Sequence, residues 1–191
     1  MKHVDETEIA SNADQRFEFL SDFMNFGEDD VRRIQASAPI IGPRIGEVVD
    51  KTYQKLLEYD ATAKHFLPKQ HGFDGELPQD LSNLSPDHPQ IKFRKDHLNR
   101  YLLALIGRSY DSKMVQYLDM VGRIHTTKAG NQEINVPLYQ MNALMGLLSD
   151  IIAEVLLDSP LSSTEAFSAI RAYNKLFWIQ NDFISRHYVT D

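Results

Sequence analysis

The chain contains no cysteine among its 191 residues. This absence excludes disulfide bonds, zinc sites with thiolate ligands, iron–sulfur clusters, thiol nucleophiles and the CxxCH attachment of a c-type haem. Any metal or cofactor must therefore be held by other side chains. A chain without cysteine also fits a reducing cytoplasm.

Long apolar runs and the common catalytic motifs are missing as well. No run of apolar residues approaches the ~20 residues needed to cross a bilayer, and the polar, acidic start MKHVDETEIASNADQ is not a secretory signal. We therefore expect no membrane partner and a cytoplasmic location. There is no HExxH motif, Walker loop, GxSxG turn or helix with paired carboxylates, so hydrolase and nucleotide-binding functions receive no support.

Positive charge is in the minority, and the formal net charge is −7. Nucleic acids and anionic membranes carry the same sign, so both are poor partners on charge grounds. Hydrophobic residues make up 42% of the chain and charged residues 25%, as in an ordinary globular protein. A chain of 191 residues is long enough for one domain with a full hydrophobic core.

Apolar residues recur mainly at the three- and four-residue steps of an α-helix, whereas the alternation typical of strands is weak. The sequence therefore predicts an all-α protein. Residues 68–89 hold four prolines and two glycines among polar residues and are expected to form a long loop. The expected helices cover residues 14–25, 45–59, 90–107, 114–125, 136–157 and 164–188, with a short helical piece after Gly27.

His125 lies on the apolar stripe of the expected helix 114–125, in line with Leu118 and Val121. A neutral imidazole on a buried helix face can ligate the iron of a haem when a carbonyl holds its other nitrogen. The carbonyl of Val121, one turn earlier, is within reach of the His125 Nδ1–H group. The alternative is a core histidine satisfied by that carbonyl, and spacing alone favours the alternative.

A haem pocket that takes up a gas also needs apolar walls and a polar donor. Tyr53 lies on the buried stripe of its helix, beside Leu56, and can supply a hydroxyl donor, although a tyrosine in this position is more often part of the core. Leu98, on the stripe of the next long helix, can supply an apolar wall. Arg94, one turn before Leu98, could pair with a haem propionate, but a solvated arginine is the favoured interpretation.

The last two expected helices are apolar on more than one face. A helix at the edge of a monomer keeps a polar face, so the wide stripes have two explanations of about equal weight. One is central burial within the chain and the other is pairing with a second subunit. The wide stripe of the last helix includes Phe167, Ile170, Phe177 and Ile184.

Four segments of the chain together resemble one family. They are TYQKLLEYDATAKHFLP, RKDHLNRYLLALIGRSYD, YLDMVGRIHTTKAG and NVPLYQMNALM. In order and spacing they are similar to the globin domain of sensor globins, and most similar to protoglobins and the haem domains of globin-coupled sensors. The resemblance covers most of the chain, from about Asp29 to Tyr188, and the helix from Asp14 resembles the family's extension before the globin helices.

The resemblance implies a globin fold, which is a helical sandwich, with an extra N-terminal helix. Residues 1–28 would form the extension and residues 29–191 the globin domain. The implied cofactor is haem b, with His125 as the proximal iron ligand and Tyr53 as the donor to bound O₂. The implied haem-binding residues are Tyr53, Leu56, Phe66, Leu98, Val121 and His125.

The resemblance also implies partners. The gas ligand would be O₂, CO or NO, and the chain would form a homodimer through its last two helices. Sensor members of the family continue into a signalling domain, so a signalling domain or partner protein is implied too. Both a stand-alone globin and a domain cut from a sensor agree with the sequence.

Three functions remain open at this point. The leading hypothesis is reversible binding of a diatomic gas at a b-type haem, for gas sensing or oxygen handling. The second is a haem-free regulatory module that keeps a globin-like fold. The third is an enzyme that carries out NO dioxygenation or peroxide chemistry at haem. Because NO dioxygenation needs an electron source and the chain has no flavin or nicotinamide module, a non-enzymatic globin is favoured.

Overall fold

The structure of the chain, a computed structural model, describes residues 1–189. Within this range the backbone forms helices and no strand, which confirms the all-α prediction. The predicted globin domain runs to residue 191, and its residues 190–191 lie outside the described residues. The α-helices are α1 (Glu6–Ser11), α2 (Ala13–Met24), α3 (Glu28–Ala36), α4 (Ala38–Leu57), α5 (Asp60–Ala63), α6 (Pro89–Gly107), α7 (Ser112–Arg123), α8 (Leu138–Leu157) and α9 (Ser163–Ser185); the 3-10 helices are η1 (Lys64–Phe66), η2 (Leu81–Asn83) and η3 (Thr127–Ala129).

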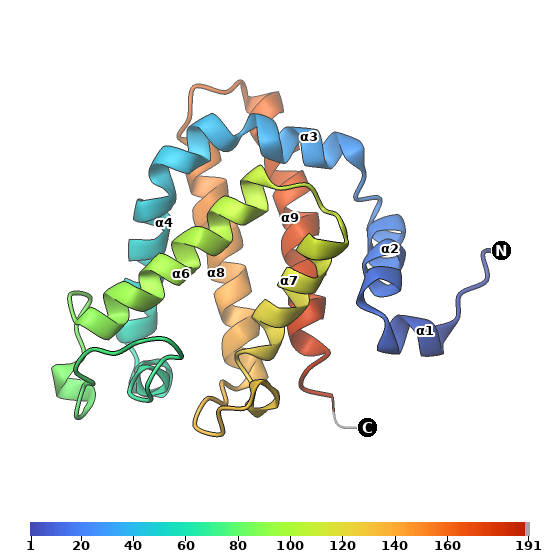
Figure 1. Cartoon of the computed structure of the whole chain (residues 1–191). Helices are drawn as coiled ribbons and strands as arrows, with labels where there is room; N and C mark the ends of the chain where they lie inside the picture. Colours follow the sequence, from blue (N-terminus) through green and yellow to red (C-terminus); the bar gives the residue numbers. More distant parts are fainter. Residues whose placement is uncertain (190–191) are drawn as a thin grey trace.

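The helices form a sandwich around one hydrophobic core. In Figure 1, α8 and α9 lie side by side behind α6 and α7, while α3 crosses above them. α4 packs on α6 and α8, and α3 and α7 both pack on α9. Fully buried side chains from these helices fill the core, among them Ile34, Ile45, Leu105, Leu118, Leu148, Leu176 and Phe183.

α8 is the most apolar long helix, and by length and composition alone it could cross a membrane. Its hydropathy is explained by its place in the bundle, because Met141, Leu148, Ile152 and Val155 are buried where α8 packs on α4 and α9. A helix covered on several sides within a domain needs no polar face there.

Local signals set the start of the two helices that frame the candidate site. α6 begins at Pro89, and proline suits the first turn because the N–H groups there have no helical partner. His88 Nδ1 accepts a hydrogen bond from the Gln90 backbone N–H at 3.2 Å. α7 begins after Asp111, whose carboxylate accepts from the Met114 backbone N–H at 3.0 Å.

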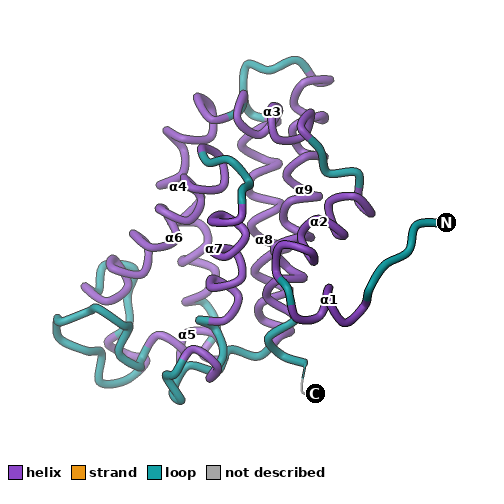
Figure 2. Tube along the Cα trace, turned by 45° about the vertical axis from the view of Figure 1, so that its right-hand side comes forward, coloured by secondary structure: helices purple, strands orange, loops and turns teal. Residues whose placement is uncertain are grey.

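The long polar loop is confirmed, and Gln90 is one of the side chains of α6 that hold its start. Figure 2 shows the loop beside the start of α6, at the end of the molecule where α5 lies. Gln90, which is fully buried, donates from Nε2 to the carbonyls of Phe66 (2.6 Å) and Pro68 (3.2 Å). Its Oε1 accepts from the Gln70 backbone N–H at 3.2 Å. The start of α6 therefore fixes the position of η1.

Several helix boundaries differ from the prediction. The helix expected from residue 45 begins at Ala38, and Pro43 lies inside it. Pro43 falls near the helix start, where it removes only the bond to the carbonyl four residues earlier. A first helix, α1, was not expected; its N-terminus is capped by Asp5, whose carboxylate accepts from the Thr7 backbone N–H at 2.9 Å.

The helix expected over 114–125 ends two residues early, at Arg123. The chain turns at this point, and the His125 carbonyl accepts a hydrogen bond from the backbone N–H of Val136 at 3.0 Å. His125 therefore follows α7 instead of ending it. The last helix also ends early, at Ser185 instead of Tyr188.

Candidate functional site

The predicted site residues gather where α6 and α7 move apart. The two helices meet at Tyr101 and Tyr117, whose ring centroids are 6.2 Å apart. From there they diverge toward the lower end of the molecule in Figure 1. Arg94 lies on the diverging part of α6, and His125 follows the last residue of α7. Tyr53 lies near the end of α4, which packs on α6.

The environment of His125 fixes its chemical form. Its Nδ1 lies 2.8 Å from the carbonyl oxygen of Val121. Because a carbonyl only accepts, Nδ1 must carry the proton. Burial lowers the pKa of His125, and the positive charge of Arg94 lowers it further, while the bond to Val121 opposes both. The ring is therefore neutral at pH 7, and Nε2 keeps its lone pair free for a metal.

Tyr53 provides a protonated hydroxyl in an apolar setting. The side chain is buried, and its ring lies 5.6 Å from that of Phe66, centroid to centroid. Burial raises the pKa of Tyr53, whereas the charge of Arg94 lowers it. Burial is the larger effect, so the hydroxyl stays protonated and is a hydrogen-bond donor at any physiological pH.

Arg94 corrects the sequence interpretation, which favoured a solvated side chain. Its guanidinium lies over the Phe66 ring, 5.2 Å from the centroid. Nη2 donates to the carbonyls of Pro68 (3.2 Å) and His65 (3.4 Å), and Nε is buried without an acceptor. η1 supplies the His65 carbonyl and the start of the following loop supplies the Pro68 carbonyl, and the spacing of residues within α6 could reveal neither contact.

The remaining predicted residues differ in burial. Phe66 is in the core and contacts both Tyr53 and Arg94. Leu56, Leu98 and Val121 are partly exposed and pack against the core. The structure thus brings Tyr53, Phe66 and Arg94 into direct contact, with His125 within the electrostatic reach of Arg94.

The residues of the site fit a haem held by a single histidine. The site offers a neutral imidazole with one nitrogen that makes no hydrogen bond to the described residues, and the apolar and aromatic side chains of Tyr53, Phe66 and Leu98 pack in or against the core. A protonated tyrosine and a cationic arginine with an unused N–H group face the same region. These residues could ligate the iron, enclose the porphyrin and hydrogen-bond to a ligand or to a carboxylate.

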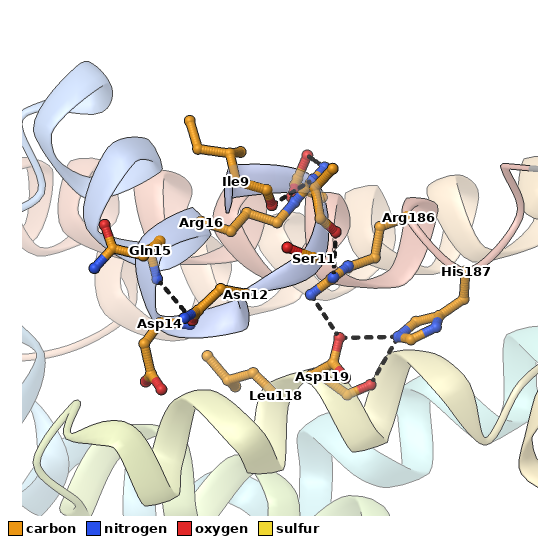
Figure 3. A network of polar contacts seen from close by, with 12 residues as sticks. Ile9, Ser11, Asn12, Asp14, Gln15, Arg16, Leu118, Asp119, Arg186 and His187 are labelled. Atoms are coloured by element: carbon orange, nitrogen blue, oxygen red, sulfur yellow. Dashed lines mark hydrogen bonds and ion pairs between the residues drawn. The ribbon is translucent and has the colours of Figure 1, made fainter. Parts of the chain in front are cut away.

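The residues that follow α9 connect α7 to the N-terminal extension. In Figure 3, Asp119 of α7 accepts hydrogen bonds from Arg186 Nη1 (3.2 Å) and His187 Nε2 (3.0 Å). Arg186 Nη2 also donates to the carbonyl of Ala10 in α1, at 2.8 Å. Arg16 of α2 forms an ion pair with Asp182 of α9. These contacts join the extension to both α7 and α9.

Two shallow hollows border this extension. One, of 410 Å³, lies beside the network of Figure 3 and is lined in part by Asn12, Gln116 and Asp119. The other, of 480 Å³, is lined in part by Phe17 and Tyr110. Neither contains a predicted site residue. Tyr53, Phe66 and Arg94 instead contact one another directly.

Comparisons with known proteins agree with the fold. A sequence model of the family described as Protoglobin matches residues 13–191. Among solved structures, the chain is similar to the globin domain of the Geobacter sulfurreducens globin-coupled sensor, with a TM-score of 0.71 and 16% sequence identity. The match covers 91% of this chain and 97% of the other. No curated protein sequence matches the chain.

Proposed function

The chain belongs to the protoglobin family, and from that premise we propose that it is a b-type haem protein. In this proposal His125 is the proximal ligand and the pocket beside Tyr53 takes up O₂, CO or NO, for gas sensing or oxygen handling. Haem, when bound, supplies the iron that coordinates the gas. The globin fold shared with a globin-coupled sensor agrees with this role.

The observation that carries the proposal is the state of His125. Its proton is held on Nδ1 by the Val121 carbonyl at 2.8 Å, and burial keeps the ring neutral by lowering its pKa. The other nitrogen, Nε2, makes no hydrogen bond with the described residues and is therefore available to a metal. Orientation through a backbone carbonyl is the usual arrangement for a metal-binding histidine.

Tyr53 and the apolar residues have separate roles in this proposal. The Tyr53 hydroxyl donates a hydrogen bond to the gas ligand, and the ring of Phe66 holds Tyr53 in place from the side. Leu56, Leu98 and Val121 exclude water and contact the porphyrin. Exclusion of water strengthens each hydrogen bond inside the pocket.

The absorption spectrum of the purified chain after haem addition tests the proposal, first in the ferric state and then reduced with dithionite under CO. We expect a Soret band in the wild type and its loss in His125→Ala. Added imidazole should restore the band, because it can fill the position that the side chain has left. The protein should remain folded in both cases, as judged by circular dichroism.

His97→Ala is the matched control. His97 Nδ1 also lies 2.8 Å from the carbonyl four residues earlier, that of Phe93, but the side chain is exposed on α6. This variant should keep the Soret band. If both histidine variants lost it equally, His125 would not be the ligand. A wild type without any Soret band would favour the haem-free regulatory module, with Tyr53 and His125 as core residues.

A further inference from the structure

Gln90 is a fully buried amide whose hydrogen bonds go to one stretch of backbone, the corner segment (residues 65–73). Its Nε2 donates to the carbonyls of Phe66 (2.6 Å) and Pro68 (3.2 Å), and its Oε1 accepts from the backbone N–H of Gln70 (3.2 Å). Burying an amide is unfavourable unless it is hydrogen-bonded, whereas burying an apolar side chain is favourable. The amide therefore does more than fill space, because it fastens the corner segment to α6.

Two neighbours of Gln90 on the same face of α6 contact the corner segment as well. Phe93 and Arg94 follow Gln90 by three and four residues, which places them on that face. The Phe93 ring lies 5.5 Å from the Phe73 ring, centroid to centroid. Arg94 Nη2 donates to the Pro68 carbonyl at 3.2 Å. One face of α6 thus holds the corner segment at several points, with Gln90 at its first turn.

The corner segment carries Phe66, and Phe66 packs on Tyr53. Both side chains are buried, and their ring centroids are 5.6 Å apart. The Tyr53 hydroxyl has no hydrogen-bond partner among the described residues. Its direction is therefore set by the packing of the ring and not by a bond to the protein. A shift of Phe66 would change where this hydroxyl points.

We propose that Gln90 is a positioning residue for the gas ligand. By holding the Phe66 carbonyl it keeps the Phe66 ring against Tyr53, and so it aims the Tyr53 hydroxyl at the ligand. The inference rests on the proposed function, in which Tyr53 donates to the bound gas. Gln90 acts from a distance, because both ends of its amide are bonded to the backbone of the corner segment. Hydrogen bonds are directional and apolar contacts are not, so an apolar side chain of the same size cannot replace it.

The first test is hydrogen exchange, which needs no haem. Gln90→Met keeps the length of the side chain and removes all three hydrogen bonds. The backbone amide of Gln70 loses its acceptor, so it should exchange with D₂O roughly tenfold faster or more, as measured by NMR or by mass spectrometry of the peptide that contains it. Unchanged exchange at Gln70 would show that Gln90 does not hold the corner segment, and the proposal would be wrong.

The second test is the rate of O₂ dissociation from the reduced, haem-loaded protein, measured by stopped flow. Gln90→Met should speed O₂ release roughly three- to tenfold, at most by the full value of one hydrogen bond in a dry pocket. In the double variant Gln90→Met/Tyr53→Phe the rate should equal that of Tyr53→Phe alone, because the hydroxyl that Gln90 positions is gone. Two effects that act independently would multiply instead.

Ser37→Ala is the control for a general loss of stability. The Ser37 hydroxyl is buried at the opposite end of α4 from Tyr53, and it donates to the Ile34 carbonyl at 2.7 Å. This variant should melt at a lower temperature and leave both Gln70 exchange and O₂ release unchanged. Gln90→Asn keeps the amide on a shorter side chain and should give intermediate changes. It carries both tests if circular dichroism shows that Gln90→Met does not fold.

Two further outcomes would overturn the proposal. One is faster exchange at Gln70 with O₂ release like that of the wild type, which would make Gln90 a purely structural residue. The other is a double variant whose O₂ release is faster than that of Tyr53→Phe by the full effect of Gln90→Met. In both cases the wild type keeps its Soret band and Tyr53→Phe keeps its effect, so the proposed function stands. A wild type without a Soret band would reject the proposed function, and the role of Gln90 toward a ligand with it.

Discussion

Tyr53 is a buried residue, and its hydroxyl has no hydrogen-bond partner among the described residues. An unused donor in a dry pocket is unfavourable for folding and useful for a ligand. Because the pKa is raised by burial, the hydroxyl does not ionise near pH 7 and cannot serve as an anion there. Its remaining role is to donate.

We therefore predict that Tyr53→Phe speeds the dissociation of O₂ by roughly tenfold, the value of one hydrogen bond in a dry pocket. Stopped-flow measurement of O₂ release gives the rate. The rate of CO release should change little, because CO accepts a hydrogen bond only weakly. The melting temperature should not fall, since no protein hydrogen bond is lost.

Tyr59→Phe is the control for this measurement, because Tyr59 follows the same helix and its side chain is exposed. It should behave like the wild type. An O₂ dissociation rate that is the same in Tyr53→Phe and the wild type would remove Tyr53 from the ligand site and leave it as a core residue.

At the level of single residues, the spacing of apolar residues predicted burial correctly where burial depends only on the position of a residue on its own helix. Tyr53 and Phe66 are buried as expected, and the bond from His125 to the Val121 carbonyl follows from a four-residue step. Arg94 was misjudged because it is partly covered by a segment from another part of the chain, residues 65–68, which lies over α6. The spacing of residues within α6 carries no information about a segment from another part of the chain that lies over it.

At the scale of helices, α7 is held in place by a close approach to α9. A Cβ atom added at Gly122 would lie 2.4 Å from the backbone carbonyl oxygen of Phe183 and 2.9 Å from Ile184 Cα. Backbone atoms cannot rotate away as a side chain can. Gln180 of α9 adds a hydrogen bond from Nε2 to the Leu118 carbonyl, at 3.2 Å. Gly122 thus sets the separation of the two helices, three residues before His125.

Gly122→Ala should therefore push α7 from α9 and lower the free energy of unfolding by about 1–3 kcal/mol, the usual effect of overpacking. Urea unfolding followed by circular dichroism measures this loss. Because His125 follows the same helix, haem should also dissociate faster from the variant.

Gly146→Ala provides the comparison, since Gly146 lies in α8 and an added Cβ there meets nothing within 4 Å. Alanine favours the helix more than glycine, so this variant should gain up to about 1 kcal/mol. If both variants shifted stability in the same direction, the close approach at Gly122 would not be what limits the packing of α7.

The positions of most helices followed from the sequence. Several helix ends did not, and neither did the close approach of α7 to α9 at Gly122. A helix was expected over 90–107, and α6 is found over Pro89–Gly107. Its ends were predictable because a proline and a glycine mark them. α1 was missed because it buries no residue and so leaves no apolar stripe to detect. Gly122 could be read from the sequence, but its contact with the backbone of Phe183 could not, because Phe183 lies 61 residues later.

At the scale of the whole molecule, helix periodicity predicted an all-α protein, and the globin fold was predictable because four segments of the chain resemble the sensor globins in order and spacing. The sequence alone could not decide whether the wide apolar stripes of α8 and α9 are buried within one chain or against a second subunit. The structure divides that stripe on α9: Phe177 and Ile184 are buried, whereas Phe167 is 62% exposed. Trp178 is 60% exposed.

Phe167 and Trp178 are separated by three turns of α9 and so lie on the same face. Large exposed aromatic side chains aligned along one helix are typical of an interaction surface. We predict that the protein is a homodimer in which this face of α9 is covered, in line with the pairing that the family resemblance implies. Trp178→Glu should convert it to a monomer, as measured by light scattering, because burying a carboxylate there is unfavourable.

The chain has one tryptophan, so its fluorescence reports on this surface directly. In the wild type, emission should lie at short wavelength at high protein concentration and move to longer wavelength on dilution, as Trp178 becomes exposed to water. Phe23→Glu, which alters a side chain that is 76% exposed on α2, should leave both the mass and this shift unchanged. A wild type with the mass of one chain and an emission independent of concentration would contradict the dimer. In that case the aromatic face of α9 would be free in the isolated protein and available to a different partner.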